Sequence, residues 1–147
     1  MAMATWSIRK ADNRDADALS ACITAAYAEV AARIADLPPV AENCAEEIAA
    51  HQVWVAEARN AVVGGLVLVP SPGFMLLANV AVHPDHQGSG LGRALMALAE
   101  TEASAQGYAE LRLNTHKDMP ENITMYRHLG WQQSGRDGNK VSMTKRL

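Results

Sequence analysis

The sequence predicts an α/β fold of the α+β type, in which a mixed, mostly antiparallel central sheet carries helices on both faces. Strand-like runs are grouped at residues 52–57, 61–69 and 74–82 and are separated by short turns, as in an antiparallel meander. After them strands and helices alternate, which is typical of a sheet layered between helices. The length of 147 residues and the absence of internal repeats indicate a single domain over residues 1–147.

The segment before the meander predicts one short strand and two helices. Trp6 and Ile8 alternate with polar residues, as on a half-buried strand. Asp12 is a candidate N-cap, and Asp15 is favourable in the first helical turn. A shorter helix is expected over residues 41–50. The apolar stripe of the first helix ends at the Pro38-Pro39 break and comprises Leu19, Ile23, Tyr27, Val30 and Ile34.

The second half predicts alternating elements and a closing hairpin. A helix is expected from residue 91 to a stop near Gly107, followed by a strand at residues 111–113. A further helix at residues 120–129 has proline in its first turn. The hairpin joins residues 131–134 and 140–144 across Asp137-Gly138.

Composition and charge exclude several classes of protein. The formal net charge is -3 and the basic residues are dispersed, so neither nucleic acid nor an anionic membrane is an expected partner. The start of the chain has no signal-peptide pattern, and the longest apolar run, residues 62–69, is too short to cross a bilayer. Cys22 and Cys44 form no CxxC pair, which favours buried thiols in a reducing, cytoplasmic setting. No HExxH or Cys/His cluster is present, so no metal is expected.

A glycine-rich segment lies between the third strand of the meander and the next helix. Gly88, Gly90 and Gly92 alternate there, so backbone N–H groups can approach a ligand closely. The helix that follows directs its N-terminal N–H groups and its dipole to the same place, and Arg93 adds a positive charge. These features predict a cradle for a diphosphate. Three glycines alone fit equally well a turn that packs a helix against a sheet.

Two familiar nucleotide motifs do not fit this segment. A GxGxxG dinucleotide fingerprint requires glycine at position 93 or 95, which hold Arg93 and Leu95. A P-loop requires a GK[ST] ending, and the segment contains no lysine. Both mismatches count against a nucleotide-binding regulatory module.

Two motifs resemble those of the GCN5-related N-acetyltransferase (GNAT) superfamily. Residues 87–92, QGSGLG, match its Q/R-x-x-G-x-G/A signature after a strand that ends in NVAVHP, residues 79–84. Residues 122–131, NITMYRHLGW, resemble its second block, N-x-x-x-Y-x-x-x-G-F, with Trp131 in place of phenylalanine. The motifs occur in the family's order, and the resemblance covers nearly the whole chain.

The resemblance implies acetyl-CoA as co-substrate and assigns the residues that bind it. In the family, the strand before the loop splays from the next strand, and its backbone binds the pantetheine arm. The loop and the helix start bind the pyrophosphate. The residues implied here are Val80, Ala81 and Val82 for the arm, and Gln87, Gly88, Ser89, Gly90, Leu91, Gly92 and Arg93 for the pyrophosphate.

The resemblance also implies the catalytic residues. Family tyrosines at the position of Tyr126 donate a proton to the leaving thiolate; a phenol, with a pKa of about 10, suits a thiol of about 8.5. Asn122, one turn earlier on the same helical face, is expected to bind the cofactor or an ordered water. The general base stays open between His116, Glu29 or Glu57 through water, a water chain, and binding of an amine that is already neutral.

The expected reaction is acetyl transfer from acetyl-CoA to a primary amine of a small molecule or peptide. Tyr27 and Arg33 are candidates to line the acceptor site, although helical spacing gives Tyr27 an equally good role in the core. Homodimers are common in the family, so a homodimer is a further expectation. The alternative is a non-catalytic acyl-CoA-binding sensor, against which Asn122 and Tyr126 both count.

Overall fold

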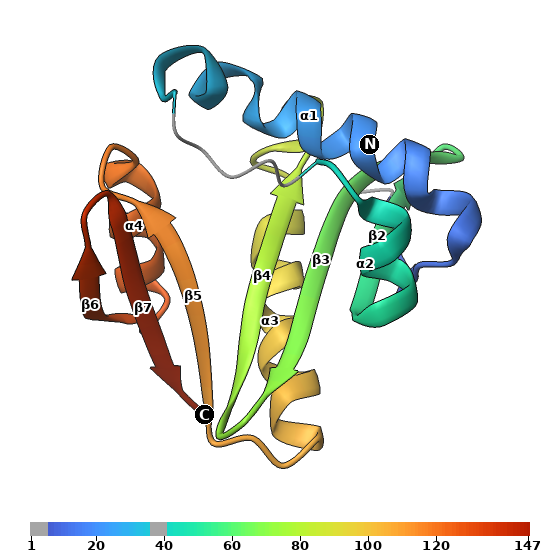
Figure 1. Cartoon of the computed structure of the whole chain (residues 1–147). Helices are drawn as coiled ribbons and strands as arrows, with labels where there is room; N and C mark the ends of the chain where they lie inside the picture. The colour runs from blue at the N-terminus through green and yellow to red at the C-terminus, as the bar shows by residue number, and fades with distance from the viewer. Residues whose placement is uncertain (1–5, 36–40) are drawn as a thin grey trace.

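The computed structural model describes residues 6–35 and 41–147. Seven strands form one sheet in the order β1-β2-β3-β4-β5-β7-β6 (Figure 1). The β4–β5 pair is parallel and the other neighbouring pairs are antiparallel, so the predicted fold class is confirmed. The strands are β1 (Ser7–Lys10), β2 (Gln52–Ala58), β3 (Ala61–Ser71), β4 (Phe74–Val82), β5 (Glu110–His116), β6 (Gln132–Asp137) and β7 (Lys140–Arg146). The helices are α1 (Ala16–Arg33), α2 (Cys44–Ala50), α3 (Leu91–Ala105) and α4 (Pro120–His128), with short 3-10 turns η1 (Asn13–Asp15) and η2 (Pro84–His86).

The predicted elements are present, with shifted ends. Asp12 caps the 3-10 turn η1 rather than α1 itself: its side chain accepts from the Arg14 N–H at 2.9 Å, and its own N–H donates to Asp15 at 2.8 Å. The second helix begins at Cys44 instead of residue 41, because Asn43 has a φ of 63°, which no α-helical residue adopts. The Pro38-Pro39 break lies outside the described residues.

Helices cover both faces of the sheet. Helices α1 and α2 pack on one face of β2, β3 and β4, where Leu19 and Ile23 are each 1% exposed. Helices α3 and α4 lie on the other face, over a core that includes Leu95 and Trp131 (Figure 1). The predicted apolar stripe is therefore buried in the first part of α1, at Leu19 and Ile23, whereas Tyr27, further along the helix, is only half-buried.

Two adjacent glycines in β3 allow both helix layers to approach the sheet closely. A Cβ on Gly65 would lie 2.5 Å from Leu19 Cδ1 of α1, and one on Gly64 would lie 3.0 Å from Leu91 Cδ2 of α3. Successive strand residues face opposite sides, so each glycine makes room for one helix. Gly65 therefore allows α1, the helix that carries Tyr27, to lie close to the sheet.

Candidate active site

The central feature of the site is the separation of β4 from β5. The two strands pair only at Met75–Leu111 and Leu76–Arg112, after which β5 continues along β7 (Figure 1). A register shift in β4 leaves Ala78 as an extra residue between Leu77 and Asn79. Such a bulge bends and twists a strand. From Leu77 to Val82, the edge of β4 that faces β5 therefore has no strand partner among the described residues, as the family resemblance implies.

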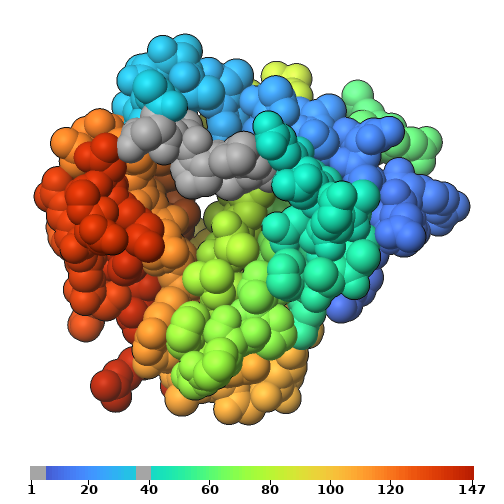
Figure 2. Space-filling view, in the orientation of Figure 1, coloured from blue at the N-terminus to red at the C-terminus, as the bar shows by residue number. Residues whose placement is uncertain are grey.

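A cavity of about 750 Å³ occupies the space between the separated strands. Its walls come from α1, β4, β5, α4 and the β6–β7 hairpin, and most of the lining is apolar. Figure 2 shows a hollow on this face between the yellow-green atoms of β4 and the orange atoms of β5. The volume lies in the range of a site for a small molecule.

Tyr126 and Asn122 both line this cavity, as expected for one face of α4. Tyr126 is 7% exposed, and burial, with a smaller contribution from Tyr27, raises the pKa of its hydroxyl above the ordinary value. The phenol is therefore protonated at neutral pH and can act as a proton donor. The Asn122 amide lies 4.0 Å from Met119 Sδ, a weak contact that leaves its polar atoms available.

Tyr27 also lines the cavity, opposite α4. Its hydroxyl donates to Asn79 Oδ1 at 3.2 Å and lies 3.4 Å from the Val80 carbonyl oxygen. Burial raises the pKa of Tyr27, so this hydroxyl also keeps its proton. Tyr27 packs against the core under α1 and also lines the cavity, so the structure shows both of the positions that the sequence leaves open for it.

The glycine loop begins at the same end of the sheet as the cavity, because η2 and the loop follow directly from β4. Gly88 and Gly90 have φ values of 81° and 85°, and a Cβ on either would meet nothing within 4 Å. Only glycine adopts this backbone easily, and the space in front of it is open. Ser89 is tied inward, since its hydroxyl donates to the His86 carbonyl at 2.6 Å.

Helix α3 offers free N–H groups at this loop. The first backbone bond of the helix runs from the Ala94 N–H to the Gly90 carbonyl at 3.0 Å, so the N–H groups of residues 91–93 precede the helical ladder. Arg93 and Gln87 are exposed beside them. Leu91, in contrast, is fully buried against Gly64, so only its backbone faces the loop. The residues present fit an anionic ligand such as a diphosphate.

The predicted pantetheine-binding residues lie on the unpaired part of β4. Val80 and Val82 pack toward the core under α3, whereas Ala81 belongs to the core under α1. Their side chains pack against the two cores, and the backbone groups of this unpaired edge remain to contact a ligand.

The structure separates the candidate bases. His116 lines the cavity, and its Nδ1 accepts from the Asp118 N–H at 3.0 Å. Accepting at Nδ1 puts the proton of the neutral ring on Nε2, which makes that nitrogen a donor and argues against His116 as a base in this arrangement. Glu29 is exposed on α1, and Glu57 is bound by Arg9 at 2.6 Å; neither lines the cavity.

Arg33 does not line this cavity. It donates to the Asp118 carbonyl at 2.9 Å and to Glu121 Oε1 at 2.7 Å. It thereby ties the end of α1 to the start of α4 across the sheet. Sequence reasoning also missed Asn139 and Lys140, which line the cavity from the β6–β7 turn and carry no local signal of that role.

Two further features concern metals and membranes. His83 shapes the turn before the glycine loop, because its Nδ1 accepts from the Asp85 N–H at 3.1 Å. Within residues 6–35 and 41–147, no group of three or more His, Cys, Asp or Glu side chains is placed to hold a metal ion. None of the helices in this part of the chain is long and apolar enough to cross a membrane.

The splayed mixed sheet, the glycine loop at a helix start and the tyrosine-lined cavity define a domain of the acetyltransferase class. A protein-family model described as "Acetyltransferase (GNAT) domain" matches residues 49–133. The chain belongs to the GNAT family.

Similar proteins agree with this assignment. The mouse probable N-acetyltransferase family 8 member 5 is 34% identical over 100 residues, which cover 64% of this chain and 44% of that protein. An uncharacterized N-acetyltransferase of Escherichia coli, YjgM, is 31% identical over 86 residues, covering 56% of this chain and 52% of its own. The chain thus spans about half the length of these relatives or less.

Solved structures share the fold over nearly the whole chain. The PaiA N-acetyltransferase of Thermoplasma acidophilum, crystallised with coenzyme A, has a TM-score of 0.86 at 19% identity, covering 97% of this chain and 99% of that one. The ribosomal-protein-S18-alanine N-acetyltransferase of Escherichia coli has a TM-score of 0.73 at 20% identity, covering 97% and 94%.

Proposed function

We propose that this protein is an acetyl-CoA-dependent N-acetyltransferase that transfers an acetyl group to a primary amine by direct attack on the thioester. The observation that carries the proposal is the position of Tyr126, whose protonated hydroxyl lines the cavity beside the unpaired edge of β4. Family membership and a relative in fold that was crystallised with coenzyme A support the choice of co-substrate.

Acetyl-CoA would be held by backbone groups. The N–H groups at the start of α3 and the loop glycines are suited to its pyrophosphate, and Arg93 adds charge. The unpaired edge at Val80 and Val82 is suited to the amides of its pantetheine arm. A backbone N–H of this edge would also stabilise the oxyanion that forms on the thioester carbonyl.

The transfer joins the amine nitrogen to the acetyl carbon and breaks the carbon–sulfur bond. Tyr126 donates its proton to the leaving sulfur, and solvent restores it. The amine gives up one proton, so that the products are an amide and free CoA thiol. Two routes remain for this proton: it leaves through water that leads to solvent, or the amine binds in its neutral form. Asn122, on the same face as Tyr126, would hold an ordered water or the cofactor.

The acceptor is a small-molecule or peptide amine, since the cavity has the volume of a small-molecule site and α1 forms one of its walls. The matched relatives are longer than this chain, so its activity and its acceptor are proposed here and not carried over from them. A cytoplasmic location and a homodimer are part of the same proposal.

The test is calorimetric titration with acetyl-CoA, with ATP and NAD as controls, followed by thiol release in the presence of an amine library. Selective acetyl-CoA binding with amine-dependent thiol release is expected. Binding without release by any amine would favour the acyl-CoA sensor instead. Failure of a folded protein to bind acetyl-CoA would refute both.

A further inference from the structure

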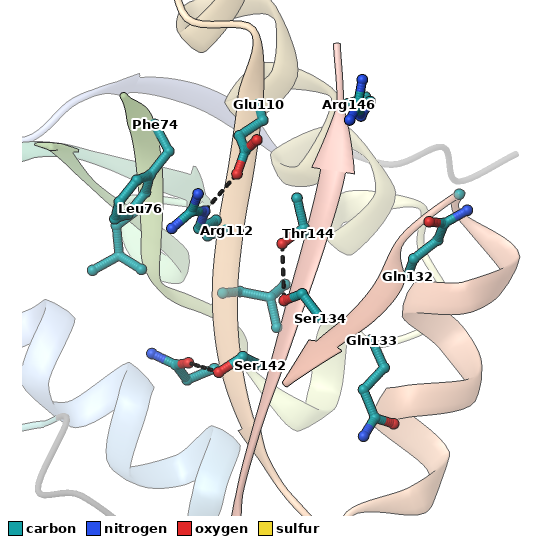
Figure 3. Close-up of a pocket in the computed structure, with 13 residues that line it drawn as sticks. Phe74, Leu76, Glu110, Arg112, Gln132, Gln133, Ser134, Ser142, Thr144 and Arg146 are labelled. Carbon is teal, nitrogen blue, oxygen red and sulfur yellow. Dashed lines mark hydrogen bonds and ion pairs between the residues drawn. The ribbon is translucent and has the colours of Figure 1, made fainter. Parts of the chain in front are cut away.

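A second hollow lies on the part of the sheet that α1 and α2 leave uncovered. It measures about 860 Å³ and is lined by side chains from the start of β4 and from β5, β6 and β7 (Figure 3). Helices α1 and α2 pack on β2, β3 and β4, and α4 packs on the opposite face of β5. We call this surface the strand groove; it includes Phe74, Glu110, Arg112, Thr144 and Arg146.

The strand groove carries an excess of positive charge. Two guanidinium groups, of Arg112 and Arg146, line it together with a single carboxylate, that of Glu110. Among the residues the structure describes, Arg146 forms no ion pair, so Glu110 balances only one of the two. An anionic ligand would be attracted to such a surface.

Arg112 is held ready to bind an anion. Its guanidinium lies 4.1 Å above the Phe74 ring, and its Nε donates to Glu110. Figure 3 shows the side chain lying between β5 and Phe74, with the bond to Glu110 dashed. Its Nη groups donate no hydrogen bond to residues 6–35 or 41–147, and the side chain is 48% exposed. A stacked arginine loses little freedom on binding, and its planar donors match a carboxylate.

The strand groove adjoins the cavity that Tyr126 lines. Leu76 and Asn114 line both hollows. Arg112 and Asn114 are two positions apart on one face of β5, which places them roughly 7 Å apart along the strand. An acceptor whose amine lies in the cavity and whose other end contacts Arg112 must therefore span at least this distance.

We propose that the acceptor is an amine carrying an anionic group roughly 7 Å or more away, and that Arg112 binds this group in the strand groove. The proposal rests on the proposed acetyltransferase function and narrows its acceptor class. Free α-amino acids, in which amine and carboxylate share a carbon, are too short to bridge the two hollows. Extended dipeptides and ω-amino acids of about six carbons, such as 6-aminohexanoate, are long enough.

The test compares two probes of equal length, 6-aminohexanoate and its neutral amide, by kcat/KM for acetylation. The wild type is expected to prefer the acid by about three- to tenfold, the range of a half-exposed charge-assisted contact. The preference is expected to shrink as salt is added. Turnover of the neutral amide reports the acetyltransferase activity itself, so turnover of both probes without a preference for the acid refutes this inference alone. If neither probe is acetylated while other amines of the library are, this inference is refuted and the proposed function stands; if no amine is acetylated, the proposed function fails.

Variants that are expected to shift the acid-to-amide ratio of kcat/KM in opposite directions test whether Arg112 recognises the anion or only supports the structure. Arg112→Gln is expected to bring the ratio near one, while Glu110→Gln, which removes the competing carboxylate, is expected to raise it about twofold or more. Arg112→Lys should recover part of the preference. Arg136→Gln removes the same charge from β6 outside the groove and is expected to leave the ratio unchanged.

Three results would overturn the proposal: a wild-type ratio of one or below, Arg112 and Glu110 variants that do not move it in opposite directions, or a ratio that collapses only in Lys140→Gln. Lys140 lines the cavity and not the groove, so the last result would place the anion elsewhere. Thermal melts of each variant show that the protein remains folded.

Discussion

The close approach of α1 to β3 at Gly65 predicts a stability change whose size can be worked out from the structure. In Gly65→Ala the new methyl carbon would lie 2.5 Å from Leu19 Cδ1, about 1 Å inside an ordinary carbon–carbon contact. Leu19 is 1% exposed and cannot swing into solvent, so α1 must shift outward or Leu19 must leave its rotamer. Overpacking of this kind costs about 1–3 kcal/mol of unfolding free energy. For a chain of this length, that lowers Tm by roughly 3–10 °C.

The assay is a double-mutant cycle, measured by urea unfolding. Leu19→Ala alone is expected to cost about 2–5 kcal/mol, because it leaves a void in the buried core. In the double variant the methyl at position 65 occupies part of that void instead of clashing. The double variant should therefore be more stable than the sum of the single effects predicts, by about 1–3 kcal/mol.

Gly135→Ala provides the matched control. Gly135 also lies in a strand, but a Cβ there meets only Ser142 Cβ at 4.0 Å. The same substitution is expected to be neutral or to stabilise by up to about 1 kcal/mol. Additive effects of Gly65→Ala and Leu19→Ala, or equal effects at the two glycines, would refute the idea that Gly65 exists to admit Leu19.

Three other predictions address the site and the acid stability of the fold. Tyr126→Phe should lower turnover by roughly 10²-fold at unchanged acetyl-CoA affinity, because only a proton donor is lost; stopped-flow thiol release measures this, and wild-type turnover would leave Tyr126 a packing role. Gly90→Val should abolish measurable acetyl-CoA binding in calorimetry, while Gly92→Ala, at a position without positive φ, should bind nearly as the wild type; equal affinities would disprove the loop assignment. Hydrogen bonds from Arg9 lower the pKa of Asp15, so their stabilisation is present above the unfolded pKa of about 3.9 and is lost as pH falls through the folded pKa. Asp15→Asn should therefore cost about 1–2 kcal/mol at pH 7 and progressively less as the pH falls below about 3.9, and a pH-independent difference in urea unfolding would contradict this.

Local sequence pattern was enough to predict the elements and the loop. The 2-residue alternation of the meander and the helical spacing from Leu19 onward are properties of short segments, so they could be read without the fold. The glycine loop was equally visible, since positive φ at Gly88 and Gly90 is a local demand that selects for glycine. The helix that carries Tyr126 was also predictable from local pattern, whereas the catalytic role of Tyr126 stays a prediction from the family resemblance.

Other parts of the site could not be predicted, because they depend on contacts between distant segments. The bond from Tyr27 to Asn79 joins residues 52 positions apart, and the tie from Arg33 to Glu121 joins residues 88 apart. The extra residue at Ala78 becomes visible only when the register of β3 against β4 is known. Nothing in the local pattern around Arg33 distinguishes a tie between helices from contact with an acceptor.

The sequence by itself therefore determined the fold class, the order of elements and the place of the glycine loop, because hydrophobic period and backbone torsion are local properties. Only the tertiary structure decided the shape of the cavity, the role of Arg33 and the course of the strand groove. Those depend on where β4 and β5 part and on how closely α1 approaches Gly65, and both are set by packing between segments far apart in the chain.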